Sequence, residues 1–172
     1  FWTGFLGIIT SLIIIMNFQA VFGSVYESYG VLISMSMFGL FTGSFLFEKI
    51  RRKILLKKVL LYIILFELIF VFLLPILVNL TATIRIIFYS YILMFIYNSF
   101  VGITYSGVNY EYLQIHSDVG KIYSFDTFGS ILGSILFSVI LLPLFGLQKL
   151  YFILIFILLI NIIFAIYYYV KK

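Results

Sequence analysis

The sequence predicts an all-α, polytopic integral membrane protein, and two observations support this fold class. The chain has 172 residues, of which 65% are hydrophobic, 21% aromatic and only 10% charged. Its mean hydropathy of +1.25 leaves too little polar surface for a water-soluble domain of this length. Uninterrupted apolar runs of about 20 residues, the length that a helix needs to cross a bilayer, recur along the whole chain. Alternating segments of about ten residues, typical of an outer-membrane barrel, do not occur.

Six transmembrane helices can be assigned, and we expect them to form a single bundle over residues 1–172. The predicted spans run from Gly4 to Phe22, Gly30 to Phe47, Lys58 to Val78, Ile84 to Tyr105, Ile122 to Leu142 and Leu150 to Val170. Each run is too long and too apolar for an interfacial helix. The sequence opens on Phe1 instead of a methionine, so we expect it to be a segment of a longer chain.

The positive charges predict the orientation of the bundle. Six of them crowd into the loop between the second and third spans: Lys49, Arg51, Arg52, Lys53, Lys57 and Lys58. The positive-inside rule makes that loop cytoplasmic, and it also suits anionic lipid headgroups. Six spans then put both ends of the segment in the cytoplasm, and the predicted location is the inner (plasma) membrane.

Small residues define the faces on which the second and fifth spans are expected to pack. In the second span the stripe contains a G-x-x-x-G pattern, Gly39 and Gly43. In the fifth span, at about 100° per residue, one face collects Tyr123, Asp126, Gly129, Ser130, Gly133 and Ser134. Such glycine spacings let helix backbones approach, and they also suit sliding surfaces in a helix that moves. Both interpretations stay open.

Asp126 is a candidate for an interhelical, gating or substrate contact. It lies about five residues past Lys121, roughly 7 Å along a helix. A structural account exists, since the helix dipole favours an acid near a helix N-terminus. However, Asp118 already occupies the natural N-cap position, which leaves Asp126 available for another partner.

Glu67 is the second candidate for binding a solute or a proton. It falls about nine residues into the third span, roughly 14 Å and so close to mid-bilayer. Burying an acid there costs at least about 2.5 kcal/mol, so it is expected to be protonated, paired or facing water. The alternative is a protonated carboxyl that is hydrogen-bonded to a neighbouring helix. Glu111 and Tyr123 are further candidates for the substrate or a proton, and Tyr105, Tyr110 and Tyr112 could offer aromatic faces to an amine.

Catalytic motifs are nearly absent from the sequence. His116 is the only histidine and there is no cysteine, so multi-histidine and thiolate metal sites cannot form within the segment. No G-x-S-x-G elbow, phosphate loop or nucleotide fingerprint occurs. We therefore predict no catalytic residues, no metal, no cofactor and no nucleic-acid partner, and we give an intramembrane enzyme little weight.

Two segments resemble known membrane families. SFLFEKIRRK, residues 44–53, resembles the loop after the second helix of major facilitator transporters. In that pattern Glu48 supplies the acid and Arg52 one of the final basic residues, while Arg51 replaces a glycine. The resemblance implies a gating role for Glu48 and Arg52.

A second resemblance covers about Asn17 to Leu147. The segments FQAVFGSVYE, MFGLFTGS, GKIYSFDTFGSILGS and LLPLFG are similar, in this order, to the multi-pass membrane region of bacterial spermidine synthase-like proteins. That region is itself similar to half of a major facilitator bundle. The resemblance implies a major-facilitator-like half-bundle that needs a second helix bundle, in the same or a partner chain, within the lipid bilayer.

Two functions follow as hypotheses. The first is a transporter-like module that moves a small cationic solute or a proton and is linked to polyamine metabolism. The second is a membrane anchor or scaffold for a spermidine synthase-like protein, whose aminopropyltransferase domain would lie outside this segment.

Overall fold

The structure is a bundle of helices, and no strand occurs among the residues it describes. A computed structural model of the chain describes residues 1–23, 26–50, 65, 68–77, 87–115 and 118–170. The helices are α1 (Trp2–Phe22), α2 (Tyr26–Ile50), α4 (Ile87–Ile115), α5 (Val119–Ile135), the π-helix η1 (Leu136–Leu141) and α6 (Leu142–Val170). A short apolar helix, Leu68–Leu77, also packs in the bundle.

Four helices are long and apolar enough to cross a membrane. They are α1 (Trp2–Phe22), α2 (Tyr26–Ile50), the part of α4 from Ile87 to Gln114, and the continuous stretch Val119–Leu147, which joins α5, η1 and the first residues of α6. Two shorter apolar helices, Leu68–Leu77 and Lys149–Ile160, coincide with parts of the predicted third and sixth spans. About half of the predicted third span, including Glu67, lies outside the described residues, as does Arg52.

The helix boundaries differ from the predicted spans mainly at three places, one of them the start of α6, which lies at Leu142 instead of the predicted Leu150. Helix α4 continues about ten residues beyond the predicted end at Tyr105, to Ile115. The predicted fifth span is divided into α5 and the π-helix η1, and α6 bends at Gly146, where φ is 65°. Helical periodicity does not report such a change of backbone register, because a π turn keeps the chain helical.

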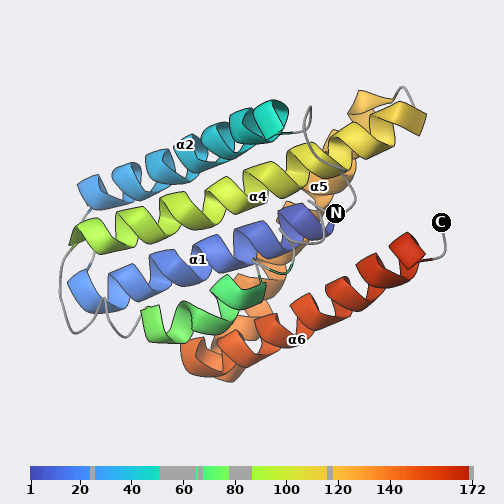
Figure 1. Cartoon of the computed structure of the whole chain (residues 1–172). Coiled ribbons are helices and arrows are strands. Elements are labelled where there is room, and N and C mark those ends of the chain that lie inside the picture. The colour runs from blue at the N-terminus through green and yellow to red at the C-terminus, as the bar shows by residue number, and fades with distance from the viewer. Residues whose placement is uncertain (24–25, 51–64, 66–67, 78–86, 116–117, 171–172) are drawn as a thin grey trace.

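The core lies around α1, which contacts α2, α4, α5 and α6. Its fully buried side chains include Ile9, Ile13 and Phe18, which join buried residues of α4, η1 and α6. Figure 1 shows α2 and α4 side by side and running in the same direction, with α1 antiparallel to α4. The outward faces of α2 and α5 are rich in exposed Phe, Ile and Met side chains, as expected for surfaces in contact with lipid.

Candidate functional site

The crossing of α2 and α4 is built on Gly39 and Gly43. A methyl group at Gly39 would lie 2.6 Å from the carbonyl oxygen of Phe95, and one at Gly43 would overlap the carbonyl oxygen of Ser99. The contact is therefore backbone to backbone, which only glycine allows. Beside it, the hydroxyls of Thr42 and Ser99 share a hydrogen bond at 3.3 Å.

The crossing of α1 and α5 is built in the same way on Gly129 and Gly133. A methyl group at Gly129 would overlap the carbonyl oxygen of Phe1, and one at Gly133 would lie 2.9 Å from the carbonyl oxygen of Phe5. From the opposite side, Gly4 of α1 faces the backbone of Asp126. All the glycines predicted to pack thus lie at helix crossings.

Asp126 lies within this second crossing. The hydroxyl of Thr3, on α1, donates a hydrogen bond to Asp126 Oδ1 at 2.5 Å, and the Asp126 side chain is half-buried. It lies seven residues beyond Val119 at the start of α5, about 10 Å along the helix. Because this hydrogen bond joins the two helices, it depends on the relative position of α1 and α5.

The two crossings are related by an internal repeat. Adding 90 to the α2 numbers and subtracting 94 from the α4 numbers converts the Gly39–Phe95 and Gly43–Ser99 contacts into Gly129–Phe1 and Gly133–Phe5. The same rule converts the ring pair Phe38–Phe95, whose centroids are 5.6 Å apart, into Phe128–Phe1, whose centroids are 6.3 Å apart.

Gly7 of α1 contacts Val101 of α4, since a methyl group added at Gly7 would lie 3.2 Å from Val101 Cγ1. Subtracting 94 from 101 gives 7, so the same rule exchanges these two residues and leaves their contact unchanged. A contact that maps onto itself lies on the axis that relates the two halves. Because α1 and α4 are antiparallel (Figure 1), the α4–α5 half is inverted relative to the α1–α2 half.

The repeat also has a sequence signal, which hydropathy analysis passes over. Residues 30–47 align with 120–137 without a gap, and eight of these 18 positions are identical: Gly30/Gly120, Ser34/Ser124, Phe38/Phe128, Gly39/Gly129, Gly43/Gly133, Ser44/Ser134, Leu46/Leu136 and Phe47/Phe137. Burial follows the same register, since Phe47 is 2% exposed and Phe137 is 1% exposed. Asp126 aligns with Ser36, so only the second half carries an acid at this position.

Buried polar side chains join α1 to α4. The Tyr97 hydroxyl donates to the Leu6 carbonyl oxygen at 3.2 Å, and Asn98 Nδ2 donates to Ser11 Oγ at 3.5 Å. Thr10 is fully buried, and its hydroxyl has no hydrogen-bond partner among the described residues. The carbonyl one turn earlier, which a helical threonine normally uses, is that of Leu6 and already accepts from Tyr97.

A further polar contact fixes α6 to α1. Asn17 Nδ2 donates to the Tyr151 hydroxyl at 2.8 Å and to the Ile13 carbonyl oxygen at 2.8 Å. Tyr151 belongs to the buried apolar core, and Asn17 is half-buried. The bond therefore joins the two helices at one defined point.

The remaining predicted residues lie away from these crossings. Tyr123 is 66% exposed and leaves the predicted face, while its neighbour Ile122 is half-buried instead. Glu48 is exposed near the end of α2. Glu111 is half-buried in the extension of α4, where the ring centroids of Tyr110 and Phe47 lie 6.4 Å apart.

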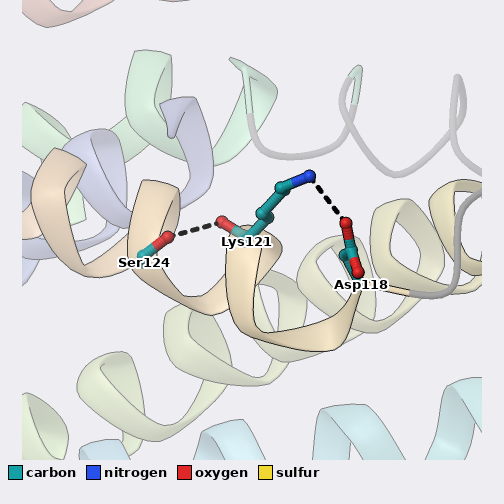
Figure 2. Close-up of polar contacts among 3 residues, drawn as sticks. All are labelled: Asp118, Lys121 and Ser124. Carbon is teal, nitrogen blue, oxygen red and sulfur yellow. Dashed lines mark hydrogen bonds and ion pairs between the residues drawn. The ribbon is translucent and has the colours of Figure 1, made fainter.

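The start of α5 is held by an exposed ion pair. Asp118 occupies the N-cap position, but its carboxylate makes no capping hydrogen bond. Lys121 Nζ donates to Asp118 Oδ2 at 2.6 Å, and Ser124 Oγ donates to the Lys121 carbonyl oxygen at 2.9 Å (Figure 2). Asp118 thus serves the helix end, and Asp126 serves the crossing with α1.

In the described part of the chain, no group of three His, Cys, Asp or Glu side chains could hold a metal ion. No known family profile, curated protein or solved structure matches the chain.

Proposed function

We propose that this chain is a transporter-like module of the membrane, made of two inverted halves, which moves a small cationic solute or a proton. The observation that carries the proposal is the inverted repeat of the α1–α5 and α2–α4 crossings. Inverted repeats recur in transporter folds, including the half-bundles of major facilitators, because two equivalent halves can exchange conformations across a membrane. In this proposal the module works with a second helix bundle, in the plasma membrane, with both ends of the segment in the cytoplasm.

Asp126 is the residue we assign to the moving solute or proton, together with Glu67. Its carboxylate bridges α5 and α1 through Thr3, so neutralising it, or attracting a cation to it, changes the force that holds that crossing. Charged groups inside membrane spans are costly and serve pathways or relays where they occur. The link to polyamine metabolism is part of the proposal and rests on the sequence resemblance.

Uptake into proteoliposomes tests the proposal. We expect labelled putrescine or spermidine, or protons followed with an internal pH dye, to enter faster than into empty vesicles. Asp126→Asn is expected to lower the rate at least severalfold. Asp118→Asn is the matched control, because that acid lies exposed at the start of the same helix, and it is expected to leave the rate unchanged.

Two results would count against transport. Absence of uptake for every probe rejects the transporter proposal, and unchanged uptake in Asp126→Asn removes Asp126 from it.

A membrane anchor or scaffold for a spermidine synthase-like enzyme is the second candidate. The hydrogen bond from Thr3 favours it, since a carboxylate fixed at a helix crossing can be purely structural. It predicts that Asp126→Asn lowers the stability of the bundle without changing any flux.

A further inference from the structure

The end of α5 changes its backbone register at Leu136–Leu141, the π-helix η1. Just after it, the Leu142 amide donates to the carbonyl oxygen of Phe137, five residues back instead of four. Pro143 follows directly. A proline ring clashes with the carbonyl four residues earlier and brings no N–H, so the wider turn relieves a clash with Val139. The π turn therefore has a local cause in the sequence.

The first half of the repeat supports this cause. Residues 46–50 of α2 align with 136–140, and Leu46 and Phe47 are identical to Leu136 and Phe137. In α2 this segment is α-helical as far as Ile50. The two sequences diverge from Glu48 and Ser138 onward. The Ser138 hydroxyl donates to the Ser134 carbonyl oxygen at 2.7 Å, a contact that bends helices.

A second break follows three residues after Pro143. Gly146 has φ 65° and ψ 169°, which is outside the helical region, and a methyl group added to it would have no neighbouring side chain or helix within 4 Å. Between the two breaks, Leu144 is 71% exposed and Phe145 42% exposed. On either side the chain is anchored, because Phe137 and Leu150 are each 1% exposed.

We propose that residues 138–146 form a hinged connector between α5 and α6, with Pro143 and Gly146 as its two pivots. The connector moves while Phe137 on one side and Leu150 with Tyr151 on the other stay fixed to the core. Bending at Pro143 breaks no hydrogen bond there, since proline donates none. Gly146 takes up the compensating rotation, because glycine tolerates this backbone region without strain. This inference stands on backbone geometry and goes beyond the proposed transport.

The effect of Pro143 on the position of the side chains that follow the π turn can be estimated. If the π turn becomes an ordinary α-helical turn, the residues beyond it rotate by one position, about 100°. For a side chain at the outer radius of a helix, about 5.5 Å from its axis, that rotation moves its end by about 8 Å. A distance measurement resolves a shift of this size.

The experiment uses pairs of spin labels in the full chain, reconstituted in lipid nanodiscs. The sequence has no cysteine, so single cysteines can be placed freely at exposed sites. One label at Ser34 on α2 serves as the reference. The second is placed at Leu144, within the connector, or at Thr127, on α5 before the hinge.

We expect a broad distribution of distances from Ser34 to Leu144 and a narrow one from Ser34 to Thr127. Pro143→Ala is expected to narrow the Leu144 distribution and to shift its mean by several ångströms, leaving the Thr127 distance unchanged. Pro75→Ala, in the short helix Leu68–Leu77, is the matched proline control and is expected to change neither distance.

The proposal is overturned if the wild-type Leu144 distribution is as narrow as that of Thr127. It is also overturned if Pro143→Ala leaves the Leu144 distribution as it was. If Pro143→Ala also disturbs the Thr127 distance, and so the fold, the wild-type comparison alone decides. None of these readouts involves uptake, so a failure here is distinguishable from a failure of the proposed function.

Discussion

Replacing Gly43 by alanine is expected to separate α2 from α4. The new methyl group would overlap the carbonyl oxygen of Ser99 and would lie 2.8 Å from its carbonyl carbon and 3.1 Å from the amide nitrogen of Ile103. Ordinary contact begins at 3.4 Å, so the carbon contact alone requires the helices to part by about 0.6 Å (3.4 minus 2.8). Backbone atoms of a packed helix cannot swing away as a long side chain would.

Overpacking of this kind costs about 1–3 kcal/mol. Alanine returns about 0.5–1 kcal/mol of helix propensity, which offsets part of the cost. Gly30→Ala isolates that gain, because Gly30 lies in the same helix with no atom within 4 Å of the added carbon. For a chain of this size, about 2–4 °C of melting temperature corresponds to each kcal/mol.

The assay is thermal unfolding of the purified protein in detergent or nanodiscs, followed by the loss of monodisperse protein. We expect Gly43→Ala to melt several degrees below the wild type, and Gly30→Ala to melt at or above it. Equal melting temperatures for Gly43→Ala and wild type, or an equal loss in both variants, would refute the close-packing argument.

Substitutions at three further residues test the polar contacts by the same melting assay. Asp126→Ala removes the acceptor for Thr3 and is expected to cost about 1 kcal/mol, whereas Asp126→Asn keeps an acceptor oxygen and is expected to cost less; an equal loss in both would mean that charge, not the hydrogen bond, matters. Tyr151→Phe removes the contact with Asn17 and is expected to cost about 0.6 kcal/mol, the average for such bonds in membranes; no measurable loss would mean that packing alone fixes α6. Thr10→Val removes a buried hydroxyl that has no partner among the described residues and is expected to leave stability equal or higher, so a clear loss would reveal a partner for that hydroxyl.

The apolar runs predict where helices occur but not where they end. The first two spans coincide with α1 and α2 within a few residues. The extension of α4 was not predicted, because Glu111 and two tyrosines lower the hydropathy there while the ring of Tyr110 still packs on Phe47. The π turn was not predicted either, although Pro143 is its signal.

The helical phasing of the fifth span places the glycines on the face that packs against α1. It also places Tyr123 on that face, whereas the structure exposes this side chain. Measured from Asp126 at about 100° per residue, Ile122 lies nearer than Tyr123 to the centre of the face that carries Gly133. The structure accordingly half-buries Ile122 and exposes Tyr123. Which helix this face meets cannot be read from one span, because the partner, α1, lies more than a hundred residues away in sequence.

The most direct test of the inverted repeat is the membrane side of two equivalent glycines, Gly30 and Gly120. Both begin the aligned segments, and each has open space around it, so Gly30→Cys and Gly120→Cys are expected to fold normally. In intact cells a membrane-impermeant maleimide labels only the outer side. The inverted repeat predicts that the two cysteines are labelled from opposite sides, and the positive-inside rule predicts that Gly30→Cys is the one labelled in intact cells, with Gly120→Cys labelled only after the membrane is permeabilised. Labelling of both from the same side would contradict it.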